Sequence, residues 1–194
     1  MKLRGLYAIT PDGVAIDKVR LALEGGVALV QYRNKTRDVE HAAAVVKLCK
    51  EHKVPVVIND DVALALKFDA DGAHLGRDDG DLQAARTRLQ TRMLGVSCYN
   101  EAHLARAAVA AGADYVAFGS VFASPTKPNA VRAPLALFSE AKALGVPLAA
   151  IGGITLQNAP LLLAAGADLL AVISDLFDAP DIRRRAADYA KLFR

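Results

Sequence analysis

Short apolar runs alternate along the chain with longer segments in which apolar residues recur every three or four positions. The short runs, such as Val56-Val57-Ile58, are rich in β-branched residues, which is typical of buried strands. The longer segments carry one apolar stripe, for example Ala42, Val45, Val46 and Cys49, as expected of helices that pack one face on a core. The pattern therefore predicts strands and helices in regular alternation.

Eight strands and eight helices are expected from this pattern. The expected strands cover residues 4–10, 27–33, 55–59, 72–75, 93–98, 115–119, 148–152 and 169–174. Polar residues follow nearly every strand, and chemistry at the carboxyl ends of successive strands is typical of a parallel α/β barrel. We therefore predict an α/β fold of the (β/α)8 TIM-barrel class, with residues 1–194 as a single domain.

The same alternation is compatible with an open, doubly wound parallel sheet. No glycine-rich fingerprint follows the first strand, however, and the polar groups are not confined to one switch point. A repeat also favours regular units, because the segments 110–117 and 164–171 have nearly the same sequence, and residues 68–73 are a looser copy. The glycine and aspartate of these repeated segments are predicted to be structural, at junctions between a helix and the next strand.

Composition narrows the class of protein further. The chain has 194 residues, of which 53% are hydrophobic, which suits one sizeable core. No apolar run is long enough to span a bilayer and no signal-peptide region precedes the first strand, so we expect a soluble, cytoplasmic protein without a membrane partner. The two cysteines, Cys49 and Cys98, are expected to be reduced thiols.

The charge of the chain does not indicate a nucleic-acid partner. The formal net charge is +3, and the densest basic cluster, residues 183–185, is expected to be the solvated face of a terminal helix. Arg33, Lys35 and Lys127 lie after different strands instead. Cations that meet only in the folded chain suit a compact anion, so we expect small phosphorylated ligands. The oligomeric state stays open, with a homo-oligomer as one possibility.

Residues 119–132 form the longest segment without periodic structure. Its hydroxyl groups and its lysine are of the types that bind phosphate, and its position after the sixth strand favours a loop over a ligand. The alternative is a long surface connection. Gly152-Gly153 and Ile173-Ser174, after the last two strands, lie where barrels commonly bind phosphate through backbone N–H groups.

Asp60 and Asp79 are the candidate metal ligands. Two carboxylates that follow different strands can meet at the barrel mouth and would suit Mg²⁺, which takes one or two carboxylates together with waters and phosphates. The alternative is that each aspartate caps the amino terminus of the next helix. His74, inside an apolar strand, is expected to be a packed residue with both nitrogens hydrogen-bonded rather than a general base.

The ordered set of these motifs resembles the thiamine phosphate synthase family almost from end to end. The motifs that carry the resemblance are Val30 to Lys35, Ile58-Asn59-Asp60, His74-Leu75-Gly76, Gly95-Val96-Ser97, Phe118-Gly119 through Lys127, and Ile151 to Ile154. The resemblance implies a (β/α)8 barrel that joins hydroxymethylpyrimidine diphosphate to hydroxyethylthiazole phosphate with Mg²⁺. Pyrophosphate and thiamine phosphate are the products, and pyrophosphate leaves before the thiazole nitrogen captures the pyrimidine cation.

The resemblance also implies roles for single residues. Gln31 would bind the pyrimidine, and Asp60 and Asp79 would ligate the metal. The other implied roles are contacts to the diphosphate end, by Arg33, Lys35, Asn59, Ser97 and Lys127, and contacts to the thiazole phosphate, by Ser124, Thr126, Gly153, Ile173 and Ser174. Arg33, Lys35, Ser97 and Lys127 would stabilise the leaving group, so no protein nucleophile is required.

Three positions depart from the family pattern. Arg77 stands where glutamine is usual, and it would either add a cation to the diphosphate site or pair with neighbouring acids. Ser124 replaces a threonine, which keeps the hydroxyl, and Cys98 replaces a common histidine. Two other functions remain in view, a thiazole tautomerase of the same barrel and a non-catalytic barrel that binds thiamine phosphates. The cluster of diphosphate and metal residues favours the synthase over the tautomerase.

Overall fold

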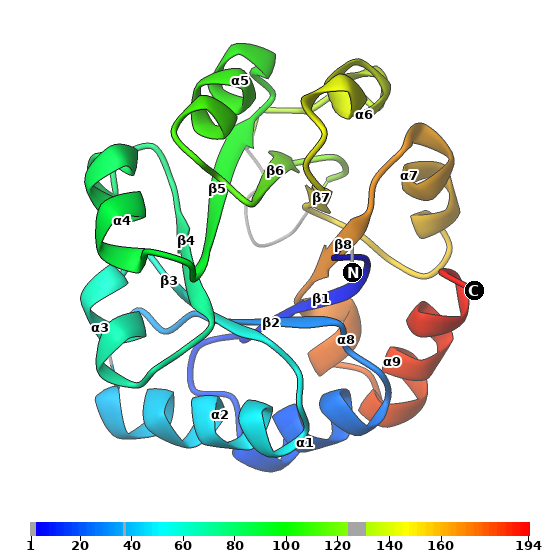
Figure 1. The fold of residues 1–194 in the computed structure, drawn as a ribbon. Helices are drawn as coiled ribbons and strands as arrows, with labels where there is room; N and C mark the ends of the chain where they lie inside the picture. The colour runs from blue at the N-terminus through cyan, green and yellow to red at the C-terminus, as the bar shows by residue number, and fades with distance from the viewer. Residues whose placement is uncertain (1–2, 37, 124–130) are drawn as a thin grey trace.

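In the computed structural model, which describes residues 3–36, 38–123 and 131–194, the strands close into a parallel barrel inside a ring of helices (Figure 1). Each strand pairs with its neighbours in chain order, and the last pairs with the first. The predicted barrel is confirmed, and the open sheet is wrong. The strands are β1 (Gly5–Ile9), β2 (Leu29–Tyr32), β3 (Val56–Asn59), β4 (Gly72–Leu75), β5 (Met93–Tyr99), β6 (Tyr115–Gly119), β7 (Leu148–Ile151) and β8 (Leu169–Val172).

The prediction of eight helices was wrong, because the described residues contain nine α-helices and one 3-10 helix. The chain after β8 forms a short helix at once and then a longer carboxyl-terminal one. The helices are α1 (Ile16–Glu24), α2 (Val39–Glu51), α3 (Val62–Lys67), α4 (Leu82–Leu89), α5 (Ala102–Ala110), α6 (Ala136–Ala141), η1 (Lys142–Leu144), α7 (Ala159–Ala165), α8 (Ser174–Phe177) and α9 (Ile182–Lys191).

Several strands end earlier than the sequence predicts, and this places polar residues in the loops at the barrel mouth. The backbone N–H of Arg33 donates to Oγ1 of Thr10 at 2.9 Å, so a side chain of the neighbouring loop takes the place of a strand carbonyl. In return the Thr10 hydroxyl donates to the Arg33 carbonyl at 3.1 Å. Ser174, which was expected at the end of a strand, is the first residue of α8.

The core has two layers because successive residues of each strand face opposite sides of the sheet. An outer cluster, to which Leu6, Val56 and Phe138 belong, fills the space between strands and helices. A smaller cluster fills the barrel interior and includes Tyr7 and Tyr115. The interior layer therefore forms the floor beneath any ligand that enters the barrel mouth.

The repeated segments at the helix–strand junctions are structural, as predicted. Gly112 and Gly166 have φ angles of 89° and 111°, a left-handed conformation that glycine adopts without strain. The aspartate just before the next strand, in the looser copy as well, accepts a hydrogen bond from a backbone N–H near the start of the preceding strand. The pairs are Asp71 with Val56 at 2.8 Å, Asp114 with Leu94 at 2.7 Å and Asp168 with Leu148 at 3.1 Å.

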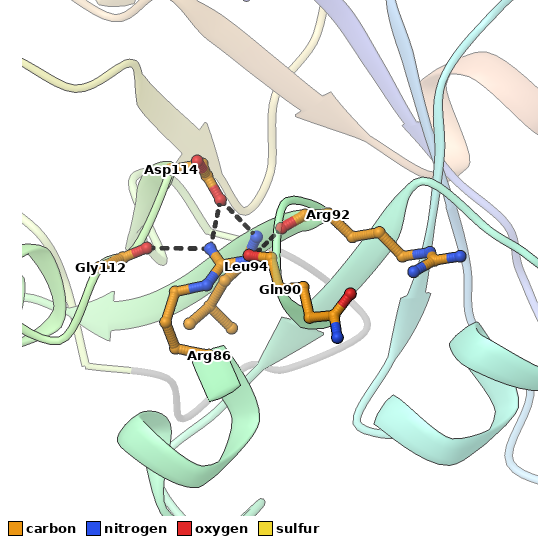
Figure 2. A network of polar contacts seen from close by, with 6 residues as sticks. All are labelled: Arg86, Gln90, Arg92, Leu94, Gly112 and Asp114. Carbon is orange, nitrogen blue, oxygen red and sulfur yellow. Dashed lines mark hydrogen bonds and ion pairs between the residues drawn. The ribbon is translucent and has the colours of Figure 1, made fainter. Parts of the chain in front are cut away.

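One junction is reinforced by an arginine of α4 (Figure 2). The Arg86 guanidinium donates to the Asp114 carboxylate at 2.9 Å and to the Gly112 carbonyl at 3.1 Å. It also donates to the carbonyls of Gln90, at 2.6 Å, and Arg92, which satisfies carbonyls just beyond the end of the helix. This network lies at the amino-terminal end of the strands, opposite the polar mouth, and therefore serves stability.

Candidate active site at the carboxyl end of the barrel

A cavity of about 910 Å³ lies at the carboxyl ends of the strands. The predicted site residues that line it are Gln31, Arg33, Asn59, Ser97, Gly153, Ile173 and Ser174. Residues that follow different strands, and that lie far apart in the sequence, thus surround one space. A cavity of this size suits two small organic substrates or one larger one.

Asp60 and Asp79 lie beside this space and line an adjoining cavity of about 250 Å³. The N–H of Asp60 still donates to the His74 carbonyl at 2.8 Å, after which the backbone turns through a φ of 60°. That left-handed conformation is uncommon outside glycine and is typical of functional positions. It brings the Asp60 carboxyl group within hydrogen-bond contact of the Asp79 carboxyl group.

Partial desolvation and the neighbouring Asp79 raise the pKa of Asp60 to about 6. The Asn59 amide, which donates to Asp60 Oδ2 at 2.6 Å, and the Arg33 guanidinium act in the opposite direction. Asp79 Oδ2 accepts from the backbone N–H of Gly76 at 2.6 Å, which fixes its orientation. Two carboxylates held together in this way repel each other until a proton or a cation lies between them.

The alternative interpretation, in which Asp60 and Asp79 cap helices, is wrong. Asp61 caps α3 by accepting from the Leu64 N–H, and Asp81 caps α4 by accepting from the Ala84 N–H. The caps are one and two residues further along because the chain must first turn away from the strand ends. Asp60 and Asp79 are therefore left with carboxylates that no helix terminus uses.

These two carboxylates and the neighbouring Asn59 amide fit a magnesium ion by their chemistry. Mg²⁺ prefers oxygen ligands and usually binds one or two carboxylates, with waters and substrate phosphates completing the octahedron. No group of three or more histidine, cysteine or acidic residues that could hold a metal is found in the described part of the chain.

A continuous chain of hydrogen bonds crosses the floor of the large cavity. Gln31 Nε2 donates to Tyr7 Oη at 2.6 Å, and Tyr7 Oη lies 2.7 Å from Tyr115 Oη. His74 Nδ1 lies 2.9 Å from Tyr115 Oη, and its Nε2 lies 2.9 Å from Ser97 Oγ. Five side chains on five strands are thus joined, and the prediction that both nitrogens of His74 are hydrogen-bonded is confirmed.

Burial determines the protonation of this chain. It lowers the pKa of His74 to about 4, because the charged imidazolium is poorly solvated in the barrel interior. It also raises the pKa values of Tyr7 and Tyr115 above the ordinary tyrosine range. At neutral pH the chain therefore contains a neutral imidazole between neutral hydroxyl groups.

The opposite side of the cavity is formed by the loops after β7 and β8. Gly153 has a φ of 62°, and a Cβ atom there would lie 2.2 Å from the Ala123 carbonyl oxygen, so only glycine fits. Ser174 begins α8, and the next residue, Asp175, is held by two side chains of α9. Its Oδ2 lies 2.7 Å from Arg185 Nη1 and accepts from the Tyr189 hydroxyl at 2.7 Å.

Lys35 is not brought to either cavity. It lies exposed in the loop after β2, where its backbone N–H donates to Asp12 Oδ1 at 2.7 Å. Three other predicted residues, Ser124, Thr126 and Lys127, lie outside the described residues. The ends of their loop are held to each other, because Ser120 N–H donates to the Val131 carbonyl at 3.1 Å and Ala133 N–H to the Ser120 carbonyl at 2.9 Å.

Comparison with known proteins identifies the family. The model of the thiamine monophosphate synthase family matches residues 6–176. The chain belongs to this family. A thiamine-phosphate synthase from Aromatoleum aromaticum is 58% identical over 202 aligned positions, which cover 99% of this chain and 97% of the relative. One from Methylobacillus flagellatus is 50% identical and covers 98% of this chain and 96% of that relative.

A solved structure leads to the same family. The thiamine phosphate pyrophosphorylase from Pyrococcus furiosus superposes with a TM-score of 0.87 at 32% identity, covering 99% of this chain and 96% of that one. A 3-hexulose-6-phosphate synthase has a TM-score of 0.75 at 19% identity and shares the fold. As a thiamine monophosphate synthase family member, the chain is a transferase of thiamine biosynthesis.

Arg77 is one of the three positions at which the sequence was expected to depart from the family pattern. Its guanidinium pairs with Glu101 and lies 4.8 Å from the centre of the Tyr99 ring. The acid that it binds follows β5 and is not one of the aspartates next to it in the sequence. Arg77 lines the rim of the large cavity with its charge already balanced.

Sequence reasoning missed several residues in or beneath the candidate site, among them Tyr7, Tyr115 and Asp175. A signal existed for the tyrosines, since each places a hydroxyl at an inward position of an otherwise apolar strand. No such signal existed for Asp175, whose partners lie on another helix.

The described part of the chain contains no helix long and apolar enough to cross a membrane.

Proposed function

We propose that this enzyme joins 4-amino-2-methyl-5-hydroxymethylpyrimidine diphosphate to hydroxyethylthiazole phosphate and releases pyrophosphate and thiamine phosphate. The observation that carries the proposal is one cavity lined by Gln31, Arg33, Asn59 and Ser97 beside the Asp60–Asp79 carboxylate pair. An amide, a cation and a hydroxyl next to paired carboxylates are the groups that a metal-bound diphosphate ester requires.

The pyrimidine is proposed to lie on the floor of the cavity, against Gln31. One Gln31 amide proton is used by Tyr7, which leaves the amide oxygen and the second proton for the ring nitrogens and amino group of the pyrimidine. The residue is 3% exposed, so these contacts would form in a nearly dry environment. Hydrogen bonds in such surroundings discriminate strongly against rings that lack the matching groups.

The diphosphate is proposed to lie toward the rim, where Arg33, Asn59 and Ser97 donate to its oxygens. Mg²⁺ bound by Asp60 and Asp79 would neutralise part of the diphosphate charge and make it a better leaving group. Lys35 and Lys127 are proposed to add cations from the loops after β2 and β6. Preplaced donors of this kind stabilise the charge that develops on the leaving oxygens more than they stabilise the ground state.

The thiazole phosphate is proposed to bind on the far side of the cavity. Its ligands would be the backbone at Gly153, Ile173 and Ser174 together with the hydroxyls of Ser124 and Thr126. The geometry that supports this part of the proposal is the close approach at Gly153 and the position of Ser174 at the start of α8, since both residues line the cavity.

A dissociative reaction is proposed for this arrangement. The bond between the pyrimidine methylene carbon and the diphosphate oxygen breaks, and both electrons leave with the oxygen. The thiazole nitrogen then donates its lone pair to the methylene carbon, which gives a thiazolium product without any proton transfer. This proposed route needs no protein nucleophile.

The proposed function is tested by pyrophosphate release from the purified protein with both substrates and Mg²⁺. We expect release together with thiamine phosphate, and loss of both products when a chelator is added. Substrate binding without any pyrophosphate release would overturn the proposal and favour a tautomerase or a binding protein. Ser139→Ala, on the exposed surface of α6, is the matched control for substitutions at Ser97.

The order of bond breaking needs a separate experiment. With ¹⁸O in the bridging position of the diphosphate ester, a dissociative enzyme scrambles the label into non-bridging positions of unreacted substrate. A direct displacement leaves the label in place until the thiazole phosphate is added.

The proposal also includes a cytoplasmic location, supported by the two free, buried thiols of Cys49 and Cys98, and it is compatible with a homo-oligomer.

A further inference from the structure

The hydrogen-bond chain Gln31–Tyr7–Tyr115–His74–Ser97 has a direction. The Gln31 amide nitrogen is only a donor, so Tyr7 Oη accepts from it. Among the described contacts, Tyr115 Oη is the other partner of the Tyr7 hydroxyl, and it therefore receives the Tyr7 proton. The opposite order would leave a buried hydroxyl proton without an acceptor, which is a strongly unfavourable arrangement.

The same rule determines the remaining two links. Tyr115 already accepts from Tyr7 and has one proton of its own, which it donates to His74 Nδ1. A neutral imidazole with Nδ1 as acceptor carries its proton on Nε2. Nε2 therefore donates to Ser97 Oγ, and the Ser97 proton is free to point into the cavity.

We propose that His74 is a positioning residue that holds Ser97 as a hydrogen-bond donor to the leaving diphosphate, and that Tyr115 and Tyr7 set the His74 tautomer for this task. This inference rests on the proposed function, because it needs a leaving group that gains negative charge. With the chain reversed, Ser97 would donate to His74 and present lone pairs to the diphosphate. The direction of the hydrogen-bond chain thus decides whether the contact between Ser97 and the diphosphate is attractive or repulsive.

The packing around the chain holds it in this arrangement. A Cβ atom on Gly95 would lie 2.1 Å from the Tyr115 ring, so the absent side chain makes room for that ring. The Tyr7 and Tyr115 rings meet edge to face with centroids 5.8 Å apart, and the His74 ring lies 5.5 Å from the Tyr115 ring. Tyr7, Tyr115 and His74 are at most 5% exposed. Water therefore competes little for these hydrogen bonds.

The His74 tautomer can be measured without any substrate. The chain has 4 histidines, so ¹⁵N-histidine labelling gives a simple spectrum, and single changes at His41, His52 and His103 identify the His74 signals. We expect a protonated Nε2 and an unprotonated Nδ1 at pH 7.5. A proton on Nδ1, or on both nitrogens, overturns the proposal. This result does not depend on catalysis, so it stays separate from a failure of the proposed function.

The link to Ser97 is tested by a double-mutant cycle. Tyr115→Phe removes the donor to His74 Nδ1, and we expect kcat to fall about 10-fold or more, which is less than the about 10²–10³-fold cost of losing a preplaced donor outright. In the Ser97→Ala background the same change should have little effect, since the residue through which it acts is gone. Equal losses in both backgrounds would mean that Tyr115 acts independently of Ser97, which overturns the proposal.

Two further variants exclude a merely structural effect. Tyr7→Phe leaves Tyr115 free to donate to His74, so we expect a rise in KM for the pyrimidine diphosphate and a smaller loss of kcat. Tyr32→Phe removes another buried tyrosine hydroxyl, which donates to the Asp38 carbonyl at 3.0 Å on the outer face of β2, and should leave kcat unchanged. If Tyr32→Phe and Tyr115→Phe lower kcat equally, the loss is one of packing and the proposal fails.

Discussion

Single residues at the barrel mouth differ in how far their charges are already balanced. The Asp60 carboxyl group lies against that of Asp79 and is only partly compensated by the Asn59 amide and the Arg33 guanidinium. Arg77, in contrast, is paired with Glu101 and stacked on Tyr99. A partly compensated charge is available to a ligand, whereas a charge in an ion pair has to break its contacts first. This contrast leads to opposite expectations for changes at Asp60 and at Arg77.

Asp60→Asn is expected to stabilise the metal-free protein above pH 6 and to abolish metal-dependent turnover. Because the pKa of Asp60 is raised from 3.8 to about 6, the folded state binds this proton more tightly than the unfolded state does. Stability should therefore fall as the pH rises through that window. After allowance for solvent screening the gain is about 1 kcal/mol or less, or about 2–4 °C in Tm.

The measurement is thermal unfolding in chelator at several pH values, with Asp178→Asn as an exposed control. An Asp60→Asn variant with the same Tm as the parent protein at every pH from 4 to 8 would contradict the raised pKa. A variant that retains full Mg²⁺-dependent activity would contradict the metal role instead. The two parts of the prediction therefore fail separately.

Arg77→Gln, which introduces the residue expected from the family resemblance, is expected to change KM for the pyrimidine diphosphate by less than about 3-fold. The lost ion pair is solvent-exposed, and such pairs contribute about 0–1 kcal/mol. Steady-state kinetics at low and high salt check this. If KM instead rises by about 10-fold or more at unchanged Tm, the Arg77 guanidinium leaves Glu101 to bind the diphosphate.

At the scale of elements, the two ends of the barrel strands have different roles, one in stability and the other in the candidate site. The amino-terminal ends are joined by aspartates that accept backbone N–H groups, and one of them, Asp114, also pairs with Arg86 of α4 (Figure 2). The carboxyl-terminal ends carry the candidate site. Stability and function are therefore separable by which end of a strand is changed.

Asp114→Ala should lower stability and leave catalysis intact. The change leaves the Leu94 N–H and the Arg86 guanidinium without this acceptor, at a cost of about 2–3 kcal/mol. Denaturant unfolding gives the loss, and kcat/KM at a temperature where the variant is folded gives the control for function. Asp17→Ala, whose side chain is 92% exposed in a loose pair with Arg20, should change neither quantity. A fall in kcat/KM of the folded variant would contradict the separation.

Because α9 contacts the start of α8, we expect a change at Tyr189 of α9 to affect binding of the thiazole phosphate. Tyr189→Phe removes the hydroxyl that donates to Asp175, next to the proposed phosphate-binding backbone at Ser174. We expect a several-fold rise in KM for the thiazole phosphate, little change in kcat, and a loss of about 1 kcal/mol in stability. An unchanged KM for the thiazole phosphate would mean that Arg185 alone holds Asp175.

At the scale of the whole molecule, α9 links the end of the chain to its beginning. It packs on α1 and β1, although the match to the family model ends at residue 176, before this helix starts. The loops that form the site follow strands all around the barrel, so a ligand that bridges them binds only the closed, folded chain. Ligand binding should therefore raise the stability of the whole protein.

Mg²⁺ and pyrophosphate together should raise Tm by about 5–10 °C when present at about 100-fold over their dissociation constants. Mg²⁺ alone should have a much smaller effect, because two carboxylates make a weak site until phosphate oxygens complete it. Thermal-shift measurements with each component and with both provide the comparison, and Asp60→Asn should lose most of the joint effect. A full shift with Mg²⁺ alone would contradict a site shared with the diphosphate.

The fold and part of the site follow from the sequence because their signals are local. Alternating periods of two and 3.6 residues determine strands and helices, and polar residues after each strand indicate the mouth of a barrel. Gln31, Arg33, Asn59 and Ser97 were found in this way, and each lines the cavity. The glycines and aspartates at the junctions were also found, since backbone conformation there depends on near neighbours.

The tertiary structure alone decided which residues meet. Whether Asp60 and Asp79 cap helices or face each other depends on a left-handed turn after β3 and on caps formed further along the chain. The partner of Arg77 and the buried chain from Gln31 to Ser97 join residues on different strands. Strand order and barrel closure set these distances, and no local pattern in the sequence encodes them.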